Sequence, residues 1–340
     1  MKRMYALDAN RVFLASVAGA QLLIYLVAGM GVRDDMLLQF LVEAFLALPG
    51  IFYLVMRKLS VKDGLGVRVV GWKDWLLMIP LALCLDKIAE FINVVSQLFA
   101  TNSIGSHVAE LVIKYPFPVA FFVVAVMPAL CEELIYRGVL FRGYRKSGVW
   151  IAVLLTAFLF GMMHMNLNQF SYAFVLGLIF ALLREITGSI LPVVLLHIYI
   201  NGKSVVVLYA SVYYLTGLRE QYVQAQTAGD TALTAELLES AQGVPIDKAN
   251  WLQEYMNMGD SSVTDLIPTL VPGFFVAVVA VIIIFALLLW CHGGKKKLRE
   301  MFSKGEVSET EECRGWFRKV YSPELLIGLL FCAGFMLLKL

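Results

Sequence analysis

Residues 117–141 read FPVAFFVVAVMPALCEELIYRGVLF, a run that is long and apolar enough to cross a membrane as one helix. Three charged residues, Glu132, Glu133 and Arg137, interrupt the second half of this run. A charged side chain is costly inside a bilayer, so each one within a span is a candidate functional residue. The stretch therefore predicts both a membrane fold and a polar site inside that fold.

The composition of the whole chain agrees with this interpretation. Of its 340 residues, 60% are hydrophobic and 16% are charged, against about 45–50% and about 25% in ordinary soluble domains. A compact soluble fold has no place for so much apolar surface, which excludes a soluble enzyme and a nucleic-acid-binding protein. The net charge of +2 gives no indication of a polyanionic partner.

Nine apolar runs are candidate membrane spans, and the predicted fold is an all-α, polytopic transmembrane helical bundle of about 8–9 spans. The first run is longer than the apolar core of a signal peptide, so we expect it to remain as a helix. Basic residues gather in alternate connections, which predicts the N-terminus inside and the C-terminus outside. The nine runs are 12–32, 36–56, 74–98, 117–141, 149–165, 169–184, 190–212, 267–291 and 324–338.

The polar residues of three spans have a common chemistry. Glu133 and Arg137 stand at i,i+4 and are predicted to pair on one helix face. Glu132 lies about 100° further round the helix, so it is predicted to keep its basicity. His164 closes the fifth span, and the pair His197 and Asn201 shares one face of the seventh.

A carboxylate base, two imidazoles and an amide suit the activation of water for attack on a carbonyl group. The structural alternatives are an acidic pair that reaches the nearby interface and polar side chains that join helices by hydrogen bonds. The third span also contains Asp86, Lys87 and Glu90, either a self-neutralised cluster or a wall of the same cavity. Glu43 stands alone on the second span, and the sequence assigns it no role.

Three motifs resemble those of the CPBP family, the CAAX proteases and bacteriocin-processing enzymes that are also called the Abi family. The Glu-Glu-x-x-x-Arg motif corresponds to Glu132-Glu133-Leu-Ile-Tyr-Arg137, and Phe-x-x-x-His to Phe160-Gly-Met-Met-His164. The third motif, His-x-x-x-Asn, corresponds to His197-Ile-Tyr-Ile-Asn201. The resemblance covers residues 115–212 and implies an intramembrane endopeptidase.

The resemblance also implies a role for each motif residue. Glu132 would deprotonate the attacking water, which His164 would help to hold, while His197 and Asn201 would stabilise the oxyanion. Glu133, Arg137 and Phe160 would support these groups. A zinc ion bound by Glu132, His164 and His197 is the alternative to a mechanism that needs no metal, and the residue types do not decide between them.

With this core at 115–212, the chain divides into four predicted regions. Residues 1–114 form N-terminal membrane helices of about three spans, and 267–340 form C-terminal membrane helices with a basic cytoplasmic loop. Residues 215–266 are an acidic extracytoplasmic insertion in which 231–240 is predicted to be a short amphipathic helix. The depths of Glu132 and His164 agree only if the helices near 149–170 are short, tilted or differently bounded.

The predicted function is hydrolysis of a peptide bond in a membrane-associated, possibly lipid-modified, protein or peptide. We expect a multi-pass protein in the plasma membrane of a prokaryote. Its expected partners are membrane lipid and a peptide or lipidated protein substrate, and no nucleic acid is expected. Two alternatives have other activities. One is a non-proteolytic membrane scaffold or peptide-immunity protein of the same fold, and the other is a proton-coupled transporter, for which the sequence lacks the internal repeat.

Overall fold

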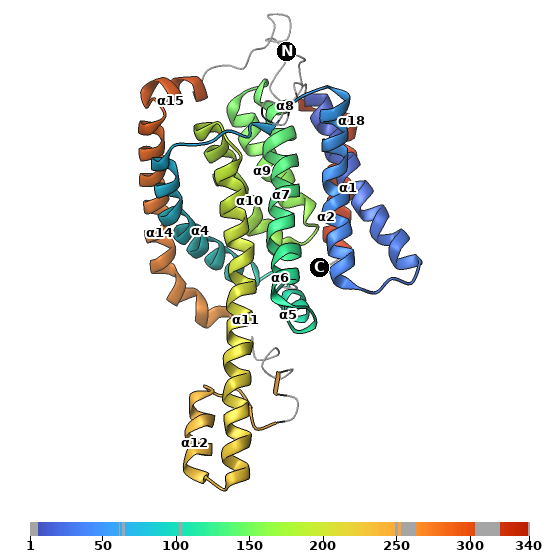
Figure 1. Cartoon of the computed structure of the whole chain (residues 1–340). Helices are drawn as coiled ribbons and strands as arrows, with labels where there is room; N and C mark the ends of the chain where they lie inside the picture. Colours follow the sequence, from blue (N-terminus) through green and yellow to red (C-terminus); the bar gives the residue numbers. More distant parts are fainter. Residues whose placement is uncertain are drawn as a thin grey trace, which may run out of the picture.

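Helices make up every regular element that the computed structural model describes, which covers residues 6–60, 62, 65–101, 104–248, 251–252, 263–302 and 320–338 (Figure 1). No strand occurs in these ranges. The all-α prediction is therefore confirmed for the described part of the chain.

Six described helices are long and apolar enough to cross a membrane, and two apolar helices are shorter. A ninth helix, α4 (Trp72–Ser96), has the length of a span and contains the Asp86, Lys87 and Glu90 cluster. These nine helices correspond to the nine predicted spans. The six long ones are α1 (Ala6–Gly29), α2 (Asp35–Met56), the helix Phe117–Arg145, α10 (Leu167–Thr187), α11 (Leu191–Ala228) and α14 (Val263–Cys291), and the shorter two are α9 (Val149–Met163) and α18 (Pro323–Leu338).

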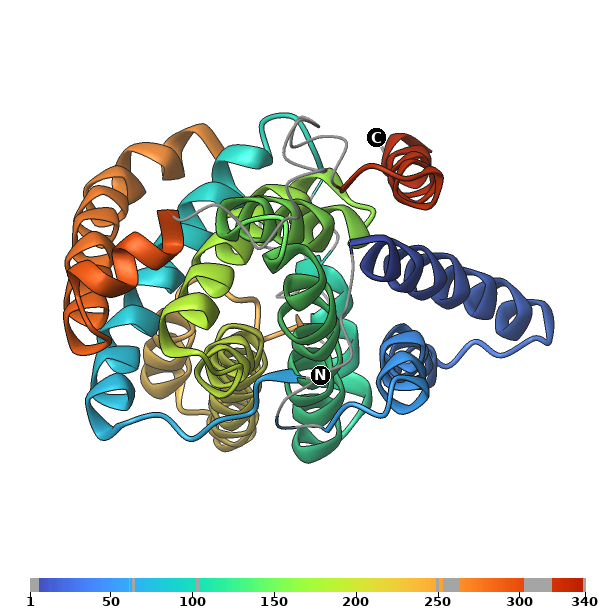
Figure 2. The ribbon, with the colours of Figure 1, turned by 90° about the horizontal axis from the view of Figure 1, so that it is seen from above.

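The helix Phe117–Arg145 lies in the middle of the bundle and has irregular segments. It consists of α6 (Phe117–Phe121), the π-helical η1 (Phe122–Val126), α7 (Met127–Glu133), the π-helical η2 (Leu134–Leu140) and α8 (Phe141–Arg145). In the view of Figure 2, α4 and α14 pack on one side of the bundle, and α1, α2 and α18 lie on the other. One hydrophobic core connects both sides through η2, α9 and α10.

The fifth predicted span, 149–165, is a short helix. α9 has 15 residues, about 22 Å at 1.5 Å per residue, and therefore ends inside the thickness of a bilayer. His164 is its C-cap residue, and Asn166 caps α10 by accepting a hydrogen bond from the backbone N–H of Gln169. Met165 and Asn166 are buried, so this turn is shielded by protein as irregular backbone in a membrane must be. The short α9 resolves the difference in depth between His164 and Glu132.

The seventh predicted span, 190–212, is part of a helix that is longer than the span. α11 continues as one helix to Ala228, where Gly229 in the left-handed region forms the C-cap. The sequence becomes more polar after residue 212 without any proline to stop the helix, so the chain leaves the membrane and remains helical. The first part of the predicted insertion is therefore a helical extension beyond the bundle (Figure 1).

The extension forms a helical hairpin with α12 (Thr231–Ser240), the short helix that the sequence predicts. The hairpin has its own small hydrophobic core, which includes Leu218, Tyr222, Leu237 and Trp251. Asp230 caps α12 by accepting a hydrogen bond from the backbone N–H of Leu233. This core is separate from the one in the membrane bundle that includes Phe160.

Candidate active site

Glu133 lies at the centre of a fully buried ion-pair network. Its Oε1 accepts a hydrogen bond from Arg137 Nη1 at 3.1 Å, and His197 Nδ1 lies 2.8 Å from the same oxygen. Arg137 Nη2 donates to the backbone carbonyl of Gly177 on α10 at 3.3 Å. Glu133 and Arg137 have no exposed surface, so the i,i+4 pair that the sequence predicts is a buried structural pair.

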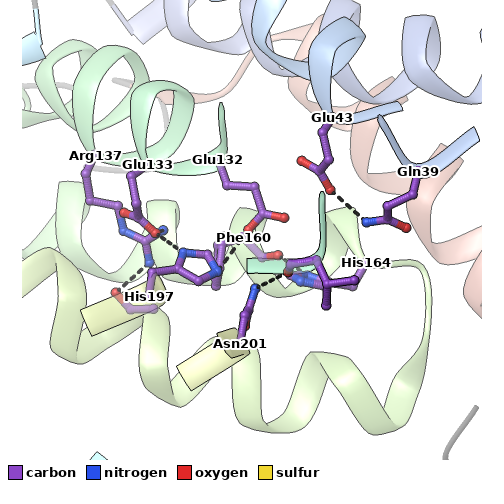
Figure 3. Close-up of polar contacts among 11 residues, drawn as sticks. Gln39, Glu43, Glu132, Glu133, Arg137, Phe160, His164, His197 and Asn201 are labelled. Carbon is purple, nitrogen blue, oxygen red and sulfur yellow. Dashed lines mark hydrogen bonds and ion pairs between the residues drawn. The ribbon is translucent and has the colours of Figure 1, made fainter. Parts of the chain in front are cut away.

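Glu132 has different surroundings, although it is the next residue in the chain. Its Oε2 lies 3.7 Å from His197 Nε2, longer than a hydrogen bond. That oxygen is buried and has no hydrogen-bond partner among the described residues. His197 is thus placed between two carboxylates, one on each ring nitrogen (Figure 3). Glu132 is therefore the less engaged of the two carboxylates.

His164 approaches this group from the end of α9. Its Nδ1 lies 2.8 Å from the backbone carbonyl of Phe160, one turn earlier. If Nδ1 carries the proton and donates it to that carbonyl, Nε2 is left as an acceptor for a water molecule. The sequence predicts His164 as a site residue, and Figure 3 shows it beside Phe160 in the same site as Glu132.

Phe160 is the ring that holds these side chains in place. The Arg137 guanidinium lies over its face, 4.2 Å from the centroid. Its ring meets His164 and His197 edge to face, with centroid distances of 5.2 Å and 5.9 Å. Phe160 therefore contacts both imidazoles and the cation of the network, which gives a physical reason for an aromatic residue at the start of this motif.

Asn201 lies one turn after His197 on α11 and points towards the central helix (Figure 3). Its Nδ2 donates to the backbone carbonyl of Val124 at 3.4 Å. Pro128 has no N–H, so it cannot give that carbonyl its usual i+4 hydrogen bond. The amide of Asn201 thus faces an interruption in the backbone hydrogen bonding next to the two glutamates.

Glu43 of α2 is the site residue to which the sequence assigned no role. It is 6% exposed, and its Oε1 accepts a hydrogen bond from Gln39 Nε2 at 3.4 Å. Its Oε2 has no partner among the described residues, and its carboxyl is directed towards that of Glu132 closely enough for the charges to interact (Figure 3). No motif or spacing links Glu43 to residues 132–201, so only the packing of α2 on α7 reveals it.

The charged cluster of the third span belongs elsewhere. Lys87 pairs with Glu90 at 2.8 Å, as the spacing predicts, and Asp86 pairs with Lys203 of α11. Lys203 is the partner that sequence reasoning missed, because it comes from a distant helix. Of the two interpretations from the sequence, the structure supports the self-neutralised cluster.

Glu132, His164 and His197 are the residues that could hold a metal ion. Within the described ranges, no group of three or more His, Cys, Asp or Glu side chains has the geometry to hold a metal ion. His197 has one ring nitrogen on Glu133 and the other towards Glu132, and His164 has Nδ1 on a backbone carbonyl. Each histidine thus has Nδ1 on an oxygen atom, an arrangement that also occurs in histidines that ligate a metal through Nε2.

Comparison with known proteins agrees with the motifs. The family model described as Type II CAAX prenyl endopeptidase Rce1-like matches residues 114–202, which contain all three motifs. No curated protein and no solved structure matches the chain. The family match indicates a CAAX-type intramembrane endopeptidase in general terms, and the apolar helices place the chain in a membrane. The matched residues 114–202 are a part of the 340-residue chain, and the match agrees with the resemblance that the three motifs show.

Proposed function

We propose that this protein is an intramembrane endopeptidase in which Glu132 activates a water molecule to hydrolyse a peptide bond. The observation that carries the proposal is the contrast between the two glutamates. Glu133 is held through its Oε1 by Arg137 and His197, although its Oε2 has no hydrogen-bond partner within the described ranges. Glu132 has no such pair of contacts, and its Oε2 has no hydrogen-bond partner among the described residues. A poorly solvated carboxylate without a cationic partner is suited to act as a general base.

The proposed reaction uses side chains of this chain at each step. Glu132 takes a proton from water, and the hydroxide forms the new C–O bond at the carbonyl carbon. The Asn201 amide and the Nε2–H of His197 donate to the oxyanion. Collapse of the tetrahedral intermediate breaks the C–N bond, and the proton held by Glu132 passes to the departing amine. His164 Nε2 orients the water before attack.

The proposed substrate is a membrane-associated protein or peptide, including lipid-modified ones. The motif residues lie on membrane helices, and Glu132, Glu133 and His197 are buried. A soluble folded protein has no access to a peptide bond at that depth. A peptide that is already anchored in the bilayer reaches the site by lateral movement, which the CAAX-type family match supports.

The test compares peptides released by the full-length protein in proteoliposomes with those released by Glu132→Gln. We expect the variant to lose hydrolysis by about 10²–10⁴-fold, the usual contribution of general acid–base catalysis. Glu236→Gln, which removes an exposed carboxyl from the outer hairpin, is the matched control and should keep full activity. Full hydrolysis by folded Glu132→Gln would refute the assignment of the base, and identical profiles with retained biological activity would favour the scaffold.

A metal-removal arm separates the two forms of catalysis. Incubation of the wild-type protein with a strong zinc chelator should leave the rate unchanged if Glu132 acts directly on water. A loss of activity that added zinc restores would instead assign Glu132, His164 and His197 as ligands.

A further inference from the structure

An arginine cluster lies at the end of the bundle where α8 and α10 finish. It consists of Arg68, Arg142, Arg145 and Arg184, which come from the connection before α4, from α8 and from the last turn of α10. The backbone of Arg68 is hydrogen-bonded to the Ser189 hydroxyl just after α10, and Arg145 binds Glu185, the residue next to Arg184. Arg142 lies on α8 with Arg145, and the charges of all three arginines act on Arg184. Four guanidinium groups from three separate segments are thus gathered in one place, apart from the catalytic motifs.

The acidic residue beside the cluster is already engaged. Glu185 accepts two hydrogen bonds from Arg145, at 2.8 Å and 3.1 Å, and a third from Lys297 at 3.3 Å. Arg184 Nε is buried and has no hydrogen-bond partner among the described residues. The local charge is therefore strongly positive, and unpaired buried charge is unfavourable unless a further anion compensates it.

The guanidinium of Arg184 is held in position by its neighbours. A Cβ on Gly66 would come within 2.4 Å of Arg184 Nη2, so the absence of a side chain at Gly66 creates the space for the cation. Phe141 lies on another side, 5.7 Å from the guanidinium carbon. The Gly66 carbonyl accepts a hydrogen bond from the Ile190 backbone N–H at 3.1 Å, which fixes this connection against the turn after α10. The cluster is therefore preorganised.

The surroundings of the cluster are typical of the headgroup layer of a bilayer. Val69 and Trp72 are 90% and 70% exposed, and both follow closely after Arg68. Exposed tryptophans are enriched where a membrane meets water. Lys62 and Arg68 also line a surface cavity of about 720 Å³. An anion at this position would lie at the depth of phospholipid phosphates.

We propose that the arginine cluster binds the phosphate of an anionic phospholipid from the surrounding leaflet. Guanidinium groups form paired, charge-assisted hydrogen bonds with phosphate oxygens. Basic pockets between membrane helices on the cytoplasmic side bind acidic headgroups by the same chemistry. The bound phosphate would connect α8, α10 and the connection before α4, and so stabilise the end of the catalytic helix.

The experiment measures the thermal stability of the purified full-length protein in detergent with added phosphatidylglycerol, phosphatidylcholine or inorganic phosphate. We expect phosphatidylglycerol to raise the unfolding temperature by several degrees and the other two to have little effect. The Arg68 side chain is exposed, so the variant Arg68→Gln should still fold. It should lose most of this increase in unfolding temperature. The double variant Arg68→Gln/Arg142→Gln should lose it all.

The matched control removes two positive charges from the same end of the bundle. Lys295→Gln/Lys296→Gln changes two exposed residues of α15 (Lys295–Phe302) and should keep the response to phosphatidylglycerol. If both double variants lost the increase equally, the effect of phosphatidylglycerol would depend only on the general surface charge of the protein. That result would overturn the proposal. An equal increase with inorganic phosphate would overturn the assignment to a lipid. The proposal is independent of hydrolysis, so its outcome does not depend on the assignment of Glu132.

Discussion

The adjacent residues Glu132 and Glu133 have different surroundings, so substitutions at the two positions should change the free energy of unfolding differently. Glu133 is hydrogen-bonded to Arg137, and both are completely buried. Glu133→Gln keeps the size of the side chain but leaves the Arg137 cation without its carboxylate, so we expect a loss of about 3–5 kcal/mol. Glu132 Oε2 has no hydrogen-bond partner to lose, so Glu132→Gln should unfold at the wild-type temperature or above it. Thermal unfolding of both variants in one detergent checks this prediction, and equal losses would contradict it.

Glu43 gives a second prediction at the scale of one residue. Its carboxyl is buried, receives one long hydrogen bond from Gln39 and faces another carboxyl. Glu43→Gln removes the unpaired acid and keeps its shape, so we expect the free energy of unfolding to rise by about 1–3 kcal/mol. Gln39→Ala, which removes the partner instead, serves as the comparison and should lower stability. A clear loss of stability in Glu43→Gln would show that this carboxyl has a favourable partner.

The residues of the site differ in how far the sequence could predict them. Glu133 and Arg137 are related by the period of one helix, so their pairing follows from spacing. His164, His197 and Asn201 were candidates because they are polar residues in apolar spans. The resemblance to a family related them to Glu132 and added Phe160. No role was predicted for Glu43 because Glu132 lies on another helix, and Lys203 was missed because Asp86 does not share its helix. A single sequence contains no signal for contacts between distant helices.

At the scale of elements, glycine allows α9 and α10 to pack closely beside the site. A Cβ on Gly177 would lie 3.0 Å from the Cα of Ala157, and the Gly177 carbonyl accepts the hydrogen bond from Arg137. Gly177→Ala should therefore separate the helices, destabilise the protein by about 1–3 kcal/mol and reduce hydrolysis. Thermal unfolding and peptide release measure the two effects.

A matched glycine distinguishes packing from helix propensity. Gly217 lies within α11, and a Cβ there would meet nothing within 4 Å. Gly217→Ala should be neutral or slightly stabilising, because alanine favours the helix by up to about 1 kcal/mol. If both substitutions had the same effect, close packing at Gly177 would not be the cause.

The boundaries of the elements were harder to predict than their existence. Hydropathy located nine helices, but it indicates which residues can contact lipid and not where a helix ends. It therefore could not predict that α11 continues beyond residue 212. The π-helical segments on both sides of Glu132 and Glu133 were also not predicted. Such segments depend on local strain and packing, here near Pro128, and are frequent at functional sites.

At the scale of the whole molecule, exposed aromatic residues and charges indicate how the bundle lies in the membrane. Exposed tryptophans occur at the start of α4, the start of α9 and the end of α14, namely Trp72, Trp150 and Trp290. Tyr213 and Tyr214 are exposed on α11 where it leaves the bundle towards the acidic hairpin. Aromatic residues of this kind mark the two interfaces, and the basic α15 lies beyond the tryptophans. The α15 end is therefore predicted to be cytoplasmic and the hairpin external.

This orientation predicts which introduced cysteines a membrane-impermeant thiol reagent can label in intact cells. Glu236→Cys on α12 should be labelled from outside, whereas Lys296→Cys on α15 should be labelled only after the membrane is opened. Both positions are exposed, and α14 lies between them in the chain. The parent protein, with its native cysteines, supplies the background signal. Labelling in the reverse order would invert the predicted topology, and labelling of both from one side would mean that α14 does not cross the membrane.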